Sequence, residues 1–279
     1  MQEIHTPVLV KELRVLLNLK SGDNAVDATL DGGGHARMML EFIKPNGKVL
    51  GIDQDKNMVE KMAGEKNITA VLGNFKDIDE IIKKRGFKKI RAILFDLGMS
   101  RWHIEGSGRG FSFGRPEEPI LMQMDARSQK NAALILNTCP ESELVRIFKE
   151  FGEVRAPWEL AKKIILARKA KRIYSVGDLL SALGIKNKKS LAKIFQALRI
   201  AVNNELEALT EALPKAFGAL DVGGRLAVIS YHSLEDRIVK NFFSTRGKIL
   251  TKKPQTASQE EITKNSSSRS AKLRVLEKI

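Results

Sequence analysis

The sequence has little cysteine and no long hydrophobic run, and each absence excludes a class of protein. Cys139 is the only cysteine among 279 residues, which excludes a disulfide framework and a cysteine-based metal site. No apolar run reaches about 18 residues, so we expect no transmembrane helix and no membrane partner. The first residues have neither the basic start nor the apolar core of a signal peptide. These features predict a cytoplasmic protein.

Acidic residues are too few to balance the basic ones. The chain has 48 Lys and Arg against 33 Asp and Glu, a net charge of +15. Between Arg127 and Val202 there are 16 basic and six acidic residues, so about a quarter of the chain holds two-thirds of the excess. A concentrated basic surplus favours a polyanionic partner, and we expect RNA rather than an ordinary solvated surface.

The first hundred residues alternate between strand-like and helical patterns. Strands are expected at 24–30, 48–53, 69–73 and 90–96, and helices at 35–43, 57–64 and 78–85. Strands separated by helical patterns of about ten residues indicate βαβ units and a parallel sheet.

The pattern changes after Met99 and resumes near residue 225. A long loop is expected at 101–125, then helices at 131–136, 141–151, 158–169, 175–183 and 190–212. A fifth strand at 225–231 precedes a helix and two short strands near 248 and 273, and the polar segment 252–269 between them is predicted to be a mobile loop. We therefore predict an α/β core at 1–105 and 203–279, interrupted by a loop and a basic helical RNA-binding insertion at 106–202.

A glycine-rich turn suggests a cofactor site. Gly32, Gly33 and Gly34 follow the first strand and precede a helix, where backbone N–H groups can approach a ligand. Asp53 lies about 20 residues further on, at the end of the second strand, where a carboxylate can bind both ribose hydroxyls.

Two cofactor classes fit this turn, dinucleotides and S-adenosylmethionine. The glycine spacing of dinucleotide sites and the phosphate loop of ATPases are both absent. Asp27, just before the turn, favours S-adenosylmethionine, because it can lie near the amino group of the methionine part. Phe75, after the third strand, could stack on adenine or belong to the core.

The run from Gly223 to Arg237 has the highest density of side chains that could take part in binding or catalysis. An apolar segment at 226–229 ends abruptly in a polar group that includes Ser230, His232 and Arg237. Ligands of parallel sheets bind just beyond such strand ends. A helix cap formed by Ser233 with Asp236 is the alternative, but it does not account for His232 or Arg237.

Motifs along nearly the whole chain resemble those of one family, the RsmH (MraW) 16S rRNA cytosine-N4 methyltransferases. The matching segments are 5–9, 27–35, 51–53, 74–75, 95–100, 109–113, 124–125, 195–205, 223–240 and 269–275. The resemblance implies a class I (Rossmann-like) methyltransferase sheet with an inserted helical domain. It also implies S-adenosylmethionine as the methyl donor and a cytosine in the decoding region of the small ribosomal subunit as the target.

The resemblance also assigns cofactor residues. By it, the cofactor is held by Gly33, Gly34, His35, Asp53, Phe75 and Asp96, and His103 stands at the position of a cofactor-contacting Gln. The chain departs from the family at Asp31, which replaces the first glycine of the turn, and at Leu121 and Gln123, which replace an Asp and an Arg. These departures motivate an alternative, a catalytically weakened RNA-binding or ribosome-assembly factor. A dinucleotide-dependent oxidoreductase is a third reading, disfavoured by the missing glycine spacing.

The catalytic hypothesis centres on Asp96, at the end of the central fourth strand, where it can touch both cofactor and target amine. Ser230 and His232 are further catalytic candidates, as substrate contacts or proton relays. The predicted substrate-binding residues are His5, Arg109, Phe111, Phe113 and Arg237, of which 109, 111 and 113 could hold a flipped-out base. We expect no metal.

Overall fold

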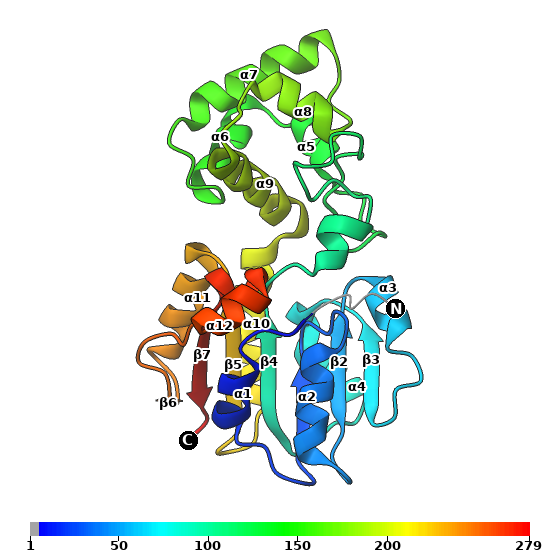
Figure 1. Ribbon diagram of the computed structural model, residues 1–279, viewed down its shortest axis with the longest axis vertical. Coiled ribbons are helices and arrows are strands. Elements are labelled where there is room, and N and C mark those ends of the chain that lie inside the picture. Colours follow the sequence, from blue (N-terminus) through cyan, green and yellow to red (C-terminus); the bar gives the residue numbers. More distant parts are fainter. Residues whose placement is uncertain (1–5) are drawn as a thin grey trace. The chain divides into compact units, whose positions relative to one another are not determined.

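The computed structural model describes residues 6–279 and contains a seven-stranded sheet (Figure 1). The strands are β1 (Asn24–Asp27), β2 (Val49–Asp53), β3 (Ile68–Leu72), β4 (Ile90–Asp96), β5 (Arg225–Ser230), β6 (Lys248–Ile249) and β7 (Lys272–Glu277). Their order is β3-β2-β1-β4-β5-β7-β6; β1 to β5 pair in parallel, and β7 is antiparallel to β5 and β6. This sheet confirms the predicted α/β class I methyltransferase fold.

Helices cover both faces of the sheet (Figure 1). Ala25, Ala92 and Ala227 are buried in one cluster with α1 (Val10–Leu17) and α2 (Gly34–Ile43). The next residue on each strand is buried in a second cluster with α4 (Ile78–Lys84), α10 (Glu205–Ala219) and α11 (Ser233–Phe243). Successive side chains of a strand point to opposite faces, so apolar strands acquire two cores. The helix α3 (Lys56–Lys61) follows β2.

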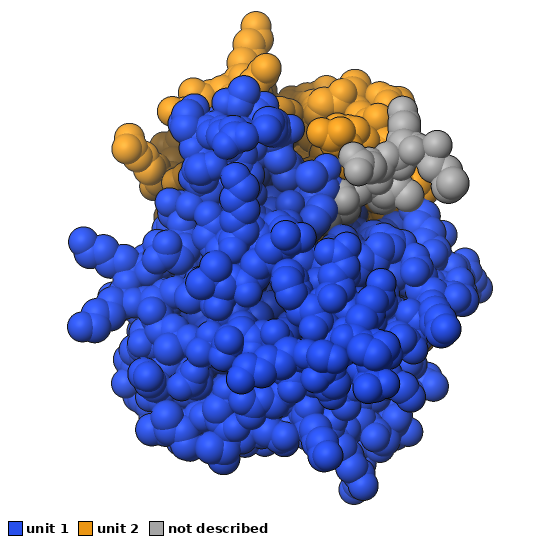
Figure 2. All heavy atoms as spheres, turned by 60° about the horizontal axis from the view of Figure 1, so that its bottom comes forward, with its two compact units in different colours: residues 1–100, 206–279 blue, residues 101–205 orange. Residues whose placement is uncertain are grey.

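The chain divides into two compact units, which Figure 2 shows in different colours. Unit 1 comprises Met1–Ser100 and Leu206–Ile279, and unit 2 comprises Arg101–Glu205. Unit 2 contains a short π-helix, Trp102–Gly106, then α5 (Ala132–Thr138), α6 (Glu141–Glu150), α7 (Pro157–Ala170), α8 (Val176–Leu183) and α9 (Lys188–Asn203). Within the described residues 6–279, no helix is both long and apolar enough to cross a membrane.

The single helix predicted at 190–212 is wrong, because the structure has two helices there. Asn204 follows α9 with a left-handed backbone (φ 50°), and α10 begins at the next residue. Asparagine tolerates this conformation better than most residues and commonly ends helices. The apolar residues on either side of this junction therefore belong to two separate helices.

The mobile loop predicted at 252–269 is also wrong. The segment contains α12 (Gln259–Lys264) and a 3₁₀ turn, Ser266–Ser270. Two of its side chains bind the beginning of the described chain: Glu261 Oε1 accepts from the Leu9 amide at 2.7 Å, and Asn265 Nδ2 donates to the Thr6 carbonyl at 3.0 Å. These long-range hydrogen bonds hold the segment on unit 1. Helix α1, which follows Leu9, had no counterpart in our sequence prediction.

Candidate active site

Four carboxylates gather at the carboxyl ends of the central strands. Asp27, Asp53 and Asp96 end β1, β2 and β4, which are neighbours in the sheet, and Asp31 lies in the turn after β1. Asp27 is fully buried. Burial raises the pKa of Asp27 well above its usual value, and the negative charges of Asp96, Asp53 and Asp31 raise it further. This concentration of negative charge favours a cationic ligand over an anionic one such as a pyrophosphate.

The Asp27 side chain has a buried oxygen that nothing in the described chain satisfies. Its Oδ1 accepts from the Thr29 amide at 3.2 Å, whereas its Oδ2 has no hydrogen-bond partner among residues 6–279. An unsatisfied buried oxygen costs about 1–3 kcal/mol. A ligand ammonium group would supply the missing donor, so the chemistry of this position fits S-adenosylmethionine, which carries both an ammonium and a sulfonium.

The glycine turn keeps the backbone accessible beside these carboxylates. Gly33 precedes α2 with φ 76°, and a Cβ there would collide with the Met62 side chain. Asp31 also has a left-handed backbone (φ 43°), as expected for an Asp that replaces glycine in this turn, and its amide donates to Asp53 Oδ2 at 2.8 Å. The departure at Asp31 therefore preserves the turn. Gly32 and Gly34 flank Gly33, and α2 begins at Gly34.

Backbone amides orient the Asp53 carboxylate. Oδ2 accepts from Asp31, and Oδ1 accepts from the Asp55 amide at 2.8 Å. A carboxylate oxygen can accept more than one hydrogen bond, so a carboxylate held in this way can also receive a ribose hydroxyl. Phe75 is half-buried and packs edge-on against Phe95, with ring centroids 5.5 Å apart, so it contacts the core of unit 1.

Asp96 is contacted by three side chains from two distant parts of the chain, Thr29 and His35 from one and Tyr231 from the other. Its amide donates to Thr29 Oγ1 at 2.7 Å, and Tyr231 donates its phenolic proton to Asp96 Oδ1 at 2.8 Å. His35, which is buried, places Nδ1 3.6 Å from Asp96 Oδ2. The His35 Nε2 lies 2.9 Å from the Val8 carbonyl, which can only accept, so Nε2 carries a proton.

Tyr231 is a site residue that our sequence reasoning missed. Burial and the neighbouring Asp96 charge raise the pKa of its phenol well above the usual value, so the hydroxyl remains a donor at neutral pH. An added Cβ on Gly98 would lie 2.7 Å from the Tyr231 ring, so glycine there permits the close approach. Because β4 and β5 are neighbours, the residues just after them meet. The pairing of β4 with β5 was therefore the signal that could have identified Tyr231 as a site residue.

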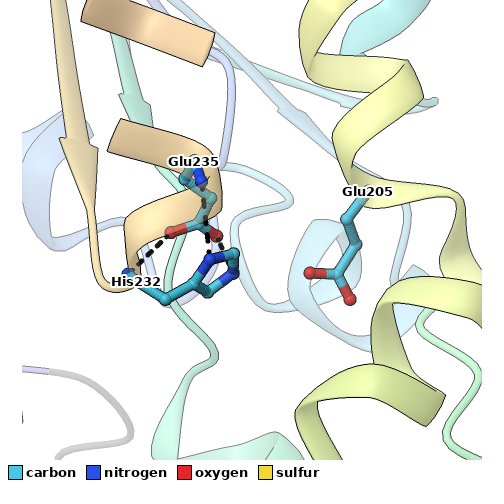
Figure 3. A group of neighbouring side chains, drawn as sticks. All are labelled: Glu205, His232 and Glu235. Carbon is cyan, nitrogen blue, oxygen red and sulfur yellow. Dashed lines mark hydrogen bonds and ion pairs between the residues drawn. The ribbon is translucent and has the colours of Figure 1, made fainter. Parts of the chain in front are cut away.

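The structure gives His232 and Ser230 local hydrogen bonds. His232, rather than the predicted Ser233, caps α11: its Nδ1 accepts from the Glu235 amide at 3.4 Å, and Glu235 Oε2 accepts from the His232 amide at 3.2 Å (Figure 3). His232 Nε2 also lies 3.0 Å from Glu235 Oε1. The predicted cap partner Asp236 instead pairs with Arg274 at 2.7 Å. Ser230 Oγ donates to the Lys272 carbonyl of β7 at 3.4 Å.

The remaining candidates divide between the units. Arg237 is exposed on α11 of unit 1, and His5 lies outside the described residues. In unit 2, His103 and Phe111 are both buried and pack edge-on with centroids 5.6 Å apart. Phe113 packs edge-on against Phe195 at 5.7 Å.

Arg109 stabilises the long loop of unit 2. Its Nη1 donates to the carbonyls of Gln123 and Met124 at 3.1 and 3.0 Å. The Arg109 carbonyl in turn accepts from the Met122 amide at 2.8 Å. Gln123 stands where the family has an arginine, and its amide donates to the Ser128 carbonyl, so the substituted position still ties the loop together.

Comparison with known proteins places the chain in a family. The relative named Ribosomal RNA small subunit methyltransferase H from Dictyoglomus thermophilum is 47% identical over 99% of this chain and 97% of its own length. The protein of the same name from Persephonella marina is 42% identical over 99% of each chain. A solved structure titled a putative methyltransferase from Streptococcus mutans in complex with SAH has a TM-score of 0.48 and 14% identity, covering 98% of this chain and 99% of that one. The model of the MraW methylase family matches residues 2–279, and this chain belongs to that family.

Proposed function

We propose that this chain transfers a methyl group from S-adenosylmethionine to the N4 amino group of a cytosine in the decoding region of 16S rRNA. Its relatives are named as methyltransferases of small-subunit ribosomal RNA, which supports an rRNA methylase. The cytosine and its N4 atom rest on the motif resemblance. The observation that carries the proposal is Asp96, held by Tyr231 beside the fully buried Asp27.

The cofactor site is formed by unit 1 residues. Asp27 would receive the amino group, Asp53 would receive the ribose hydroxyls, and Phe75 would lie against adenine. The turn Gly32, Gly33 and Gly34 and the first turn of α2, which includes His35, would receive the carboxylate end; backbone N–H groups at a helix start can bind it, although the Gly33 amide itself donates to the Leu30 carbonyl at 2.7 Å. When bound, S-adenosylmethionine supplies a methyl group activated by its sulfonium. His103 of unit 2 remains a predicted cofactor contact.

In this mechanism, Asp96 is the residue that activates the target amine and accepts its proton. The N4 lone pair of cytosine is delocalised into the ring, which makes the amine a poor nucleophile. A hydrogen bond from the amine N–H to Asp96 localises that pair on nitrogen. Bound S-adenosylmethionine would supply the methyl group by in-line displacement, in which the N–CH₃ bond would form as the C–S bond breaks and its electron pair stays on sulfur. The amine loses one proton, for which Asp96 is the acceptor, and positioning supplies most of the acceleration.

Unit 2 is proposed to bind the RNA, because most of the basic excess lies within it. Arg109, Phe111 and Phe113 are proposed to hold the flipped base, and His5 and Arg237 to contact substrate. Ser230 and His232 stay predictions whose local hydrogen bonds also suit a structural role. The target is 16S rRNA within the small subunit, in the cytoplasm.

Two observations weaken the alternative hypothesis that the chain is a catalytically weakened RNA-binding factor. It rested on departures from the family motifs, of which Asp31 keeps the turn geometry and Gln123 keeps a loop hydrogen bond. Calorimetry with S-adenosylmethionine separates the two functions, since a degenerate relative would bind it weakly.

Methyl transfer to small ribosomal subunits from a strain lacking this enzyme tests the proposal. Labelled S-adenosylmethionine and nucleoside mass spectrometry should place the label in N4-methylcytidine. Asp96→Ala should abolish the label, whereas Asp221→Ala, an exposed unit 1 aspartate, should retain it. Label in another nucleoside would contradict the cytosine target, and full activity of Asp96→Ala would remove Asp96 from the mechanism.

A further inference from the structure

Unit 2 contains a cavity of about 500 Å³ whose lining is strongly basic. It lies among the connection between α6 and α7, the start of α7, the connection between α8 and α9, and the first turns of α9. Among the described residues that line it, four are cationic, Arg155, Lys163, Lys189 and Lys193, and one is acidic, Glu159. We propose that this cavity binds the phosphate backbone of a single-stranded segment of the RNA substrate.

Two of the lysines are held in place by backbone carbonyls. Lys163 Nζ donates to the Leu183 carbonyl at 2.9 Å, and Lys193 Nζ donates to the Glu153 carbonyl at 3.1 Å. A lysine ammonium has three donors, so each retains two. Positioned cations lose less side-chain entropy when they bind an anion than freely moving ones do.

The spacing of the lysines on α9 is unfavourable without an anion. Lys189 and Lys193 are four residues apart, so both lie on one face of the helix. Like charges at this spacing destabilise a helix by about 0.2–0.5 kcal/mol. Lys163 follows Glu159 at the same spacing on α7, yet its ammonium group donates to the Leu183 carbonyl. A phosphate between α7 and α9 would offset the repulsion.

An exposed aromatic ring next in sequence to the cavity residues favours a single strand over a duplex. Trp158 is 59% exposed and stands between the cavity residues Ala156 and Glu159 in sequence. Bases of a single strand stack on aromatic side chains, with about 1–3 kcal/mol per base, whereas bases of a duplex are already stacked. The cavity and Trp158 together offer one site for a phosphate and one for an unstacked base.

This inference rests on the proposed function, because it takes RNA as the substrate. The test compares two double variants of equal charge. Arg155→Gln/Lys189→Gln removes the two cavity cations that, unlike Lys163 and Lys193, are not held by a backbone carbonyl within the described residues, so the fold should survive. Lys149→Gln/Lys169→Gln removes two exposed lysines of unit 2 that do not line the cavity.

Binding of a fluorescent single-stranded transcript of the decoding region is measured against salt. Each lost phosphate contact removes about 0.7 from the slope of log affinity against log salt, so the cavity variant should lose about 1.4. At 0.1 M salt this corresponds to about 25-fold weaker binding. Trp158→Ala should weaken binding with little change of slope. The matched variant should bind nearly as the wild type does.

The outcomes distinguish the two hypotheses. Equal weakening by both double variants would overturn the cavity site, since it would mean that only overall charge matters. If the wild type methylates rRNA but Arg155→Gln/Lys189→Gln keeps its affinity and slope, the cavity proposal alone fails. If the wild type neither binds nor methylates RNA, while binding S-adenosylmethionine, the proposed function fails and the cavity proposal with it.

Discussion

Tyr231→Phe is the sharpest test of how Asp96 is positioned. The change removes only the hydroxyl that donates to Asp96 Oδ1 at 2.8 Å and leaves the ring packed against Gly98. Hydrogen bonds to charged groups contribute about 1.5–3 kcal/mol, and the lost donor leaves the carboxylate less well oriented toward the amine. If this energy is expressed in the transition state, kcat falls about 10- to 150-fold, at 1.36 kcal/mol per tenfold.

The assay is methyl transfer at saturating S-adenosylmethionine, with cofactor affinity measured separately by calorimetry. We expect kcat to fall by more than cofactor affinity does: Asp96 is expected to touch both cofactor and amine, whereas Asp27 and Asp53 are expected to hold the cofactor without this hydroxyl. Tyr174→Phe is the matched control, since Tyr174 is the other tyrosine and is 61% exposed. An unchanged kcat in folded Tyr231→Phe would refute the assigned role of this hydrogen bond.

Three other unit 1 positions give predictions that calorimetry and unfolding can check. Pairing a cationic amino group with Asp27, whose pKa is raised in the free protein, should release a proton wherever this carboxyl is still protonated. S-adenosylmethionine should therefore bind more tightly as pH rises through the raised pKa of Asp27, and binding without proton release would contradict this pairing. Arg274 lowers the pKa of Asp236, so their pair stabilises the fold above about pH 4 and this contribution is lost as pH falls through the lowered pKa. Arg274→Met should therefore cost about 1.5–3 kcal/mol in urea unfolding at pH 7 and much less at pH 2, and an equal loss at both pH values would argue against the charge pair. Asp31→Gly should raise stability by about 0.5–1 kcal/mol in thermal unfolding by relieving the left-handed backbone, and a lower stability would show that the aspartate side chain matters more than the strain.

The sheet was predictable because its strands are short apolar runs that end at polar or turn-forming residues. Asp53 and Asp96 close their strands in the sequence as they do in the structure. Parallel pairing of neighbours then brings these ends together, so the carboxylate cluster could be expected from sequence alone. Asp27 was found by the same logic, although β1 ends there and not at Leu30 as expected.

Other features depended on local signals that we did not use. The helix breaks at a pair of asparagines, of which Asn203 ends α9 and Asn204 follows it with a left-handed backbone. Such a pair is a recognisable helix end. The helix α12 begins after Ser258, whose hydroxyl accepts from the Glu261 amide, and a serine followed three residues later by glutamate is a helix-start signal. In both places our prediction relied on overall composition and periodicity and gave too little weight to a specific capping residue.

The contacts of Asp96 could not be predicted from spacing. Its partners come from residues 35 and 231, and only the finished sheet brings them together. Likewise, the cap role of His232 depends on the side chain of Glu235, which accepts from two successive amides. A sequence shows which groups are present near a strand end, but not which neighbour uses each lone pair.

The hydrogen bonds between α12 and the beginning of the described chain reach the carboxylate cluster through one further contact. Glu261 holds the Leu9 amide across 252 positions of the sequence, and the adjacent Val8 carbonyl fixes the ring of His35 that faces Asp96. A helix that carries none of the four carboxylates therefore helps to position a neighbour of Asp96. A change in α12 should accordingly act on Asp96 without touching it.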